Sequence, residues 1–310
     1  MPWQKNLASA GCSRGYGMKK YSRLKRMNVG DWLIVVMCTF LIMACFFPVM
    51  SFVARSLSSS DAIMLGQVTI FPVEINFDAY ETVITDSRFM RALIWTIILT
   101  AIFTITAMSL TVMCAFPLTF ERLRGRKFFT FMIIFTMFFG AGTIPTYLLY
   151  RDLGLLNNPL VLILPGSLSV FNMIIMRSFF FNIPVSLKES AAIDGANPIT
   201  ILLKIYLPLS TAVLATLSLF YAVGRWNGFS DALMFMQDRR FHPIQLLLYN
   251  ILQNIVQVGD AATFEGFVSP GRPETLRSAS VVVAMIPILM IYPWLQRYFI
   301  SGATLGAIKE

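Results

Sequence analysis

The chain has 310 residues, of which 56% are hydrophobic and 13% are charged, and its mean hydropathy is +0.69. A soluble globular domain is seldom so apolar, so these proportions exclude that class and indicate a membrane protein. The net charge of +9 does not indicate a nucleic-acid partner, because the basic excess is concentrated in the N-terminal arm and one short loop, as membrane topology requires.

Several stretches without a charged residue are long enough to cross a bilayer as helices, which takes roughly 20 residues. One of them, residues 241–259, contains five Gln and Asn side chains, whose amides are costly in lipid without hydrogen-bond partners. We therefore expect an amphipathic helix at the membrane surface there; if it spanned instead, the C-terminus would change sides. The others predict an all-α integral membrane protein with six transmembrane helices, at residues 32–54, 92–120, 128–150, about 159–176, 205–224 and 278–296.

The distribution of Lys and Arg predicts the orientation, because basic residues near short loops stay on the cytoplasmic side. Seven precede the first span and four more lie at 122–127, whereas the loop between the first two spans carries five carboxylates against three arginines. Both termini are then cytoplasmic, and so are residues 186–208, between the fourth and fifth spans. The predicted organisation is a basic cytoplasmic N-terminal arm at 1–30, a membrane domain at 31–300 with an outer loop and amphipathic helix at 225–277, and a cytoplasmic tail at 301–310.

Residues 186–208 form a short charged motif between membrane-length apolar runs. Ser186 and Glu189 form a potential capping box, in which the Ser186 hydroxyl accepts from the Glu189 amide and the Glu189 carboxylate accepts from the Ser186 amide. The pattern predicts that a helix begins at Ser186.

The same unit contains signals for a turn and a second helix. Gly195 is placed to adopt the left-handed conformation that ends a helix, and Asn197 followed by Pro198 supplies an N-cap and a first-turn proline. Pro208, about ten residues into the second helix, lacks the amide that a helix interior needs and is predicted to bend or break it. We therefore expect residues 186–208 to form two helices joined by a tight turn.

No catalytic or metal-binding constellation is visible in the sequence. The single histidine, His242, has no cysteine or carboxylate cluster near it, the four cysteines lack paired metal spacing, and no G-x-x-x-x-G-K-[ST] phosphate loop occurs. We expect a transport protein that is not an enzyme, binds no cofactor or metal itself, and takes energy from another polypeptide or a gradient. The spans lack ionisable residues, which weighs against a self-sufficient secondary transporter or channel, although that alternative stays open. Arg177 and Arg225 lie near span ends and are expected to reach the lipid–water interface.

Residues 189–196, which read ESAAIDGA, and the IYLP at 205–208 resemble the EAA motif of ABC importer permeases. Ser190 is the one departure in the core triplet, where the motif has alanine, and serine is also small. Further segments are similar to the carbohydrate-uptake branch of these permeases, which includes maltose-type and oligosaccharide permeases: IPTYLLYRDLGLLNNPLVLILPG at 144–166, RSFFFNIP at 177–184, the Trp226-Asn227 pair and YPWLQRYFISG at 292–302.

The resemblance implies a type I ABC importer permease fold with a cytoplasmic coupling helix that sits in a cleft of an ATPase. It also implies a second permease subunit, homologous or identical, two cytoplasmic ABC ATPases that use ATP and Mg, and an extracellular solute-binding protein that delivers a carbohydrate, here an oligosaccharide. The implied location is the bacterial cell membrane. The resemblance identifies neither the sugar nor its length, and the start at Met1 or Met18 stays open.

The resemblance also implies tasks for residues of the motif. Glu189 caps the helix and contacts the ATPase, Ala191 and Ala192 permit close approach, and Gly195 makes the turn. The implied ATPase-coupling residues are Glu189, Ser190, Ala191, Ala192, Asp194, Gly195, Ala196, Leu207 and Pro208.

Two further tasks concern the end of the unit. Leu207 and Pro208 join it to the fifth span and transmit its tilt, and Asp194 either contacts the ATPase or caps the following turn. No substrate-binding residue is assigned, because aromatic side chains such as Tyr147 and Trp226 pack between helices more readily than they stack on sugar rings.

Overall fold

The structure, a computed structural model, describes residues 29–257 and 273–307. Most of the predicted N-terminal arm, part of the outer loop and the end of the C-terminal tail lie outside the described residues. The described part consists of helices, turns and irregular segments without a strand, which confirms the all-α prediction. It divides after Pro48 into two units, which are described separately.

The first unit contains the start of α1 (Val29–Ser56), as far as Pro48. Its large apolar side chains from Trp32 to Phe47 are exposed, and α1 is long and apolar enough to cross a membrane. Such a surface suits contact with lipid. Helix α1 contains the whole of the predicted first span.

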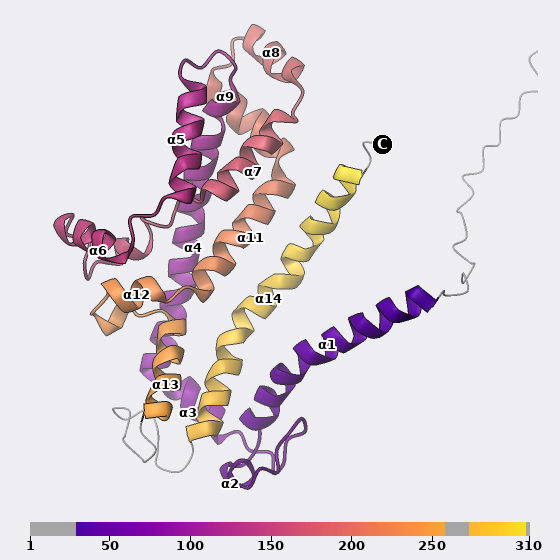
Figure 1. Ribbon diagram of the computed structural model, residues 1–310, viewed down its shortest axis with the longest axis vertical. Helices are drawn as coiled ribbons and strands as arrows, with labels where there is room; N and C mark the ends of the chain where they lie inside the picture. Colours follow the sequence, from indigo (N-terminus) through magenta and orange to yellow (C-terminus); the bar gives the residue numbers. More distant parts are fainter. Residues whose placement is uncertain (1–28, 258–272, 308–310) are drawn as a thin grey trace, which may run out of the picture. The chain divides into compact units, whose positions relative to one another are not determined.

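Helix α4 (Ser87–Ala115) is at the centre of the second unit (Figure 1). It packs against α11 (Thr211–Asn227), α7 (Val170–Phe181) and α13 (Ile244–Gln257), and α11 packs in turn against α14 (Pro273–Ala307). Buried side chains recur along α4 every three or four residues and so lie on one face; they include Phe89, Leu93, Thr96, Leu99, Phe103, Ala107, Thr111 and Ala115.

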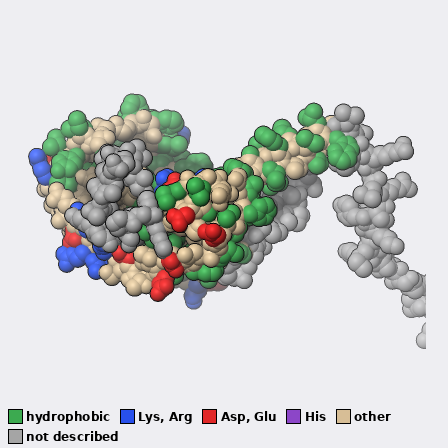
Figure 2. All heavy atoms as spheres, turned by 90° about the horizontal axis from the view of Figure 1, so that it is seen from below, with side chains coloured by type: hydrophobic (Ala, Val, Ile, Leu, Met, Phe, Trp, Pro, Cys, Tyr) green, Lys and Arg blue, Asp and Glu red, His purple; other side chains and the backbone are tan. Residues whose placement is uncertain are grey.

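The two ends of the second unit differ in charge. One end holds α2 (Ser60–Met64) and α3 (Asp78–Thr85), which pack against α14. The other end holds α8 (Val185–Ile193), α9 (Pro198–Ile201) and the basic loop after the 3₁₀ helix η1 (Pro117–Thr119). Acidic side chains are exposed at the first end, which Figure 2 shows from below; they include Asp61, Glu74, Asp78 and Glu81. The predicted orientation requires such a separation, and the side that each end faces stays a prediction.

The predicted third span, residues 128–150, is not one helix. Helix α5 (Arg126–Phe138) ends before Gly140, and α6 (Thr143–Asp152) leaves at 116° to it. Gly142 has a φ of +84°, which favours glycine, and Pro145 lies in the first turn of α6, where an amide has no partner within the helix. The continuous apolar run concealed this break, so the prediction of one helix was wrong.

The predicted fourth span, about residues 159–176, starts too early. Its first part is the 3₁₀ helix η2 (Pro159–Leu162), and the chain then runs irregularly past Pro165, which cannot donate a helical hydrogen bond. Helix α7 begins after Ser169, whose hydroxyl accepts from the amide of Asn172 at 3.4 Å. At its other end, α7 meets α8 at 73°.

The number of spans depends on how bent helices are counted. Within the described residues, three helices are long and apolar enough to cross a membrane, and up to six spans result if each of three bent pairs is one span. The exact number, six, therefore stays a prediction. Helix α14 extends beyond the predicted 278–296 at both ends and contains Pro287 and Pro293.

The predicted amphipathic helix is present as α13. It buries Ile244, Leu248 and Ile251 in a cluster that also contains side chains of α4 and α14. Its position relative to a membrane surface stays a prediction.

Candidate functional site

The predicted helix, turn and helix at 186–208 are present at the basic end of the second unit. Helix α8 (Val185–Ile193) is followed by α9 (Pro198–Ile201). The chain continues through the π-helix η3 (Leu202–Tyr206) into α10 (Leu207–Leu209). These elements together are called the coupling unit below.

Gly195 makes the turn of the coupling unit, as predicted. Its φ is +79°, and an added Cβ would meet nothing within 4 Å, so the constraint is backbone conformation and not space. The Gly195 amide donates to the carbonyl of Ala192 at 3.1 Å, and the Ala196 amide donates to the carbonyl of Ala191 at 2.9 Å. These bonds satisfy carbonyl groups at the end of α8 and make the turn well defined.

The predicted start of α8 at Ser186 was wrong. Helix α8 begins at Val185 with Pro184 as its N-cap, and no side chain makes a capping hydrogen bond there. The extended backbone of Pro184 leads into the helix, and its carbonyl accepts from the Leu187 amide at 3.2 Å, so Ser186 lies inside the first turn. The local geometry of Pro184 therefore prevails over the capping-box pattern.

The start of α9 was predicted correctly. The side chain of Asn197 accepts from the Thr200 amide at 2.7 Å, and Pro198 is the first helical residue. Because Asn197 caps this turn, the alternative role of Asp194 as its cap was wrong. Asp194 is instead the exposed C-cap residue of α8.

The structure divides the predicted coupling residues between an exposed surface and an inward face. Ala191, Ala196 and Leu207 pack against a buried cluster from α4 and α7. The sequence did not indicate the apolar side chains exposed beside the motif, among which Ile193 is 86% and Leu187 43% exposed. The predicted coupling residues that lie exposed are Glu189, Ser190, Ala192, Asp194, Gly195 and Pro208.

Tyr206 attaches the coupling unit to the membrane helices. It is 4% exposed, and its ring meets those of Phe116 and Phe180 edge-on, with centroids 5.1 and 5.3 Å apart. The ammonium of Lys188 in α8 lies 3.8 Å from the ring centroid of Phe120, in the loop after α4. The coupling unit therefore contacts the ends of α4 and α7 through Tyr206 and the loop after α4 through Lys188.

Pro208 breaks the helix, as predicted. The segment Pro198–Leu209 and helix α11 meet at 84°. Just before the proline, the Leu207 amide donates to the carbonyl of Leu202, five residues back, which is the π-type bond of η3. Because of this break, the coupling unit meets α11 nearly at a right angle and does not continue its axis.

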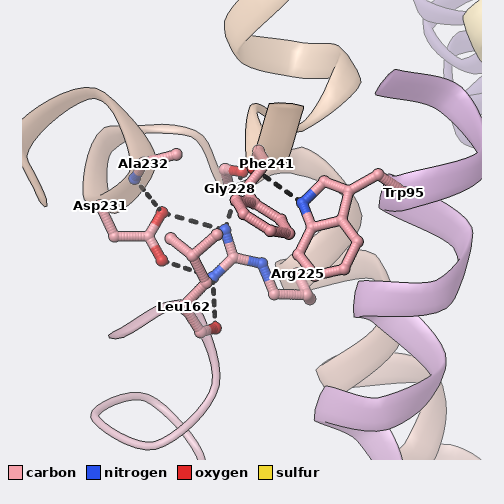
Figure 3. Close-up of polar contacts among 7 residues, drawn as sticks. All are labelled: Trp95, Leu162, Arg225, Gly228, Asp231, Ala232 and Phe241. Atoms are coloured by element: carbon pink, nitrogen blue, oxygen red, sulfur yellow. Dashed lines mark hydrogen bonds and ion pairs between the residues drawn. The ribbon is translucent and has the colours of Figure 1, made fainter. Parts of the chain in front are cut away.

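A second cluster lies at the other end of α11, around Arg225 (Figure 3). The Arg225 side chain is only 6% exposed and forms an ion pair with Asp231 through both terminal nitrogens. Nη1 also donates to the carbonyl of Leu162 at 3.0 Å, and Nη2 donates to the carbonyl of Gly228 at 3.0 Å. One guanidinium thus joins the end of α11 to η2 and to α12 (Ser230–Phe235).

The expectation that Arg225 reaches the lipid–water interface was wrong. The chain turns back after α11 and brings Asp231 to the guanidinium, so the charge is paired inside the protein. Gly228 makes room for this turn, since a Cβ there would lie 3.2 Å from the carbonyl oxygen of Gly224 and 3.3 Å from Nη2 of Arg225. The positive charge of Arg225 was visible in the sequence, but the return of the chain was not.

The segment after α12 is fastened to α4 by two more bonds. Nε1 of Trp95 donates to the carbonyl of Phe241, in the 3₁₀ helix η4 (Arg239–Phe241), at 2.7 Å (Figure 3). The hydroxyl of Thr96 accepts from the amide of Ile244, the first residue of α13, at 2.7 Å. Hydrogen bonds thus join η4 and the start of α13 to α4, while Arg225 joins η2 and α12 to the end of α11.

His242 is partly buried and lies beside a backbone carbonyl. Its Nε2 lies 3.2 Å from the carbonyl of Met236, and burial lowers the pKa of the imidazole. Within the described residues, no group of three or more His, Cys, Asp or Glu side chains could hold a metal ion.

The chain is similar to permease components of transport systems. It is 38% identical over 281 residues, which are 90% of this chain and 98% of the relative, to the polygalacturonan/rhamnogalacturonan transport system permease protein YtcP of Bacillus subtilis (strain 168). It is 36% identical over 263 residues, 84% of this chain and 88% of the relative, to protein LplC of the same organism. No protein-family model matches the chain.

A solved structure shares the fold over nearly the same length. It is the crystal structure of a bacterial ABC transporter involved in the import of the acidic polysaccharide alginate, with a TM-score of 0.81 and 34% identity over 88% of this chain and 99% of that chain. The fold and these relatives thus define a membrane permease of the ABC transport systems, a transport subunit. The chain belongs to the carbohydrate-uptake branch of that family, as its motifs predicted.

The substitution Asp231→Asn is expected to destabilise the protein, because it leaves the buried Arg225 charge without its counter-ion. A fully buried pair would lose roughly 3 to 5 kcal/mol, and we expect about 2 kcal/mol here because water reaches part of Asp231. The measurement is the thermal unfolding midpoint of the purified chain in detergent. The matched control is Asp152→Asn, which removes a carboxylate paired with Arg151 at the surface and should change stability by less than about 0.5 kcal/mol. Equal shifts for the two variants would contradict the role assigned to Arg225.

Proposed function

We propose that this chain is the membrane-spanning permease subunit of an ATP-driven importer, and that α8 receives the movement of a cytoplasmic ATPase. The observation that carries the proposal is the coupling unit. Its outer surface presents Glu189, Ser190 and Asp194 beside exposed apolar side chains, while Tyr206 fixes its other side to the membrane helices. An exposed helix with so firm an attachment is suited to transmit force from a partner.

The proposed path of movement runs from α8 to the opposite end of the chain. ATPase closure displaces α8, the turn at Gly195 keeps α8 and α9 in a fixed relation, and Tyr206 with Leu207 conveys the displacement to α4, α7 and α11. Helix α11 ends in the Arg225 cluster, which holds η2 and α12. The coupling unit and the far end of the permease are thereby mechanically linked. In this account Ala191 and Ala196 set the packing of α8 on its own chain, and the exposed members of the motif contact the ATPase.

The proposed assembly contains a second permease subunit, homologous or identical, two ABC ATPases that bind ATP and Mg, and an extracellular solute-binding protein. The absence of a phosphate loop from this sequence supports a separate ATPase. The names of the relatives, as permease proteins of transport systems, support the existence of further subunits. Nothing found among the relatives favours a self-sufficient secondary transporter or channel.

The substrate proposed is an oligosaccharide that contains sugar acids. The name of the 38% identical relative specifies polygalacturonan and rhamnogalacturonan, and the 34% identical solved transporter imports the acidic polysaccharide alginate. All three polymers carry uronic acid carboxylates. Because two relatives are named for the transport of acidic sugars, an acidic oligosaccharide is favoured over a neutral one as the substrate of this chain.

The substitution Gly195→Val tests coupling. A β-branched residue at a φ of +79° is strained by roughly 1 to 3 kcal/mol, so the turn should change and α8 should tilt. In proteoliposomes with the partner permease, the ATPases and the binding protein, we expect uptake and binding-protein-stimulated ATP hydrolysis to fall about tenfold or more.

The matched control for this test is Gly66→Val. Gly66 also has a positive φ, of +69°, with nothing within 4 Å of an added Cβ, but it lies between α2 and α3 at the other end. It should retain most of the activity. Unchanged uptake in Gly195→Val, or equal losses in the two variants, would refute the coupling role, and uptake by this chain without any ATPase would refute the proposed function as a whole.

Substrate class is tested with the same complex. Oligogalacturonates are expected to stimulate ATP hydrolysis in the presence of the binding protein, whereas neutral malto-oligosaccharides of the same length are not. Stimulation by the neutral sugars alone would show that the acidic assignment is wrong while leaving the coupling role intact.

The proposed orientation places the coupling unit and both termini in the cytoplasm of a bacterial cell. In a variant without native cysteines, Ser190→Cys should react with a membrane-impermeant maleimide only after the cells are permeabilised. Glu74→Cys, exposed at the acidic end, should react in intact spheroplasts. Labelling in the reverse order would overturn the orientation.

A further inference from the structure

A groove of about 700 Å³ lies between the loop that follows η1 and helices α5 and α7. Three of its lining side chains are basic, namely Arg126, Lys127 and Arg177, and one, Glu121, is acidic. The motif that defines the coupling unit contributes none of the residues that line it. The proposed coupling function therefore leaves the groove unexplained.

The three basic side chains of the groove outnumber its one carboxylate, that of Glu121. The guanidinium groups of Arg126 and Arg177 lie over the same ring, that of Phe181, at 5.0 and 5.2 Å from its centroid. Nε of Arg177 donates to the carbonyl of Leu118 at 3.3 Å. Within the described residues, none of the three basic side chains forms an ion pair with a carboxylate. Two cations on one ring repel each other, and an anion between them would relieve that repulsion.

An apolar stripe begins at the basic side chains. Lys127, Phe131, Ile134 and Phe138 are spaced four, three and four residues apart, so they share one face of α5. Phe131 and Ile134 line the groove, and Phe131 and Phe138 are 65% and 73% exposed. From Lys127 to Phe138 the stripe extends about 17 Å along the helix. A ligand that fills both parts must combine an anionic head with a long apolar tail.

We propose that this groove binds an anionic phospholipid, with the phosphate of the headgroup between Arg126, Lys127 and Arg177 and an acyl chain along the apolar face of α5. Guanidinium groups bind phosphate oxygens through paired N–H donors, which suits the two arginines. Basic side chains at the end of a membrane helix lie at the level of lipid headgroups. A soluble partner or free phosphate could bind the three basic side chains but would leave the apolar stripe uncovered.

The test compares lipids retained by the purified full-length chain after extraction from vesicles that contain equal amounts of phosphatidylglycerol and phosphatidylcholine. Native mass spectrometry counts the lipids that remain bound. Wild-type protein should retain phosphatidylglycerol preferentially, and the double variant Arg126→Gln, Arg177→Gln should lose about tenfold or more of that preference, since each cation near an anionic headgroup contributes roughly fivefold.

Two further variants separate binding from folding. Arg122→Gln with Arg124→Gln removes the same charge from exposed positions of the same loop that do not line the groove, and it should retain the preference. Arg126→Lys with Arg177→Lys keeps the charge and should retain most of it. A loss of preference in the Gln pair with retention in both controls supports the proposal.

Three results would overturn the proposal. One is equal retention of the two lipids by wild-type protein, or an unchanged preference in the Gln pair. Another is displacement of phosphatidylglycerol by inorganic phosphate at millimolar concentration, which would assign the groove to free phosphate. The third is loss of ATPase binding by the Gln pair with no change in lipid preference, which would make the groove a protein interface.

Discussion

Burial of the Tyr206 ring between Phe116 and Phe180 makes the exposed helix α8 part of the membrane bundle. Without this contact, α8 and the turn after it would rest on the bundle mainly through the small side chains Ala191 and Ala196, which bury little apolar area. Tyr206 also meets the end of α4, a helix of 29 residues that is about 44 Å long. The aromatic cluster thus joins the coupling unit, the proposed contact surface for the ATPase, to a continuous helix of 29 residues.

The other end of the permease depends on a different kind of interaction. Arg225 organises η2, α11 and α12 through carbonyl oxygens and one carboxylate, and a buried pair of this kind specifies an arrangement more than it adds net stability. Between the two ends, the hydroxyls of Thr111 and Tyr221 share a hydrogen bond of 2.7 Å, and the Ser169 amide donates to Tyr221 at 3.1 Å. Tyr221 of α11 is therefore hydrogen-bonded both to α4 and to the start of α7.

Local backbone rules explain what the sequence could predict. Gly195, Asn197 with Pro198, and Pro208 each impose a conformation on their own peptide units, so the turn, the cap and the break were predicted from residue type. Hydrophobic content likewise predicted the helical membrane class. The capping box failed because an adjacent residue, Pro184, offered a competing helix start.

Tertiary packing explains what the sequence could not predict. The apolar run at 128–150 could form one straight span or the bent pair α5 and α6, because its side chains are apolar in either arrangement. The sequence therefore did not reveal the bend. The inward position of Ala191 depends on how α8 lies on α4 and α7, and the pairing of Arg225 depends on a loop that returns six residues later. These features need the folded chain before they can be recognised.

Helices α5 and α7 contain 13 and 12 residues and are about 20 and 18 Å long, whereas the hydrocarbon core of a bilayer is about 30 Å thick. Neither helix alone is long enough to cross that thickness, and residues 139–142 after α5 and 163–169 before α7 are not helical. Backbone of that kind at membrane depth must be covered by protein or face water. The segments that complete the crossing beside α5 and α7 thus need protein or water around them, whereas the 29-residue helix α4 satisfies its own backbone over more than the thickness of the hydrocarbon core.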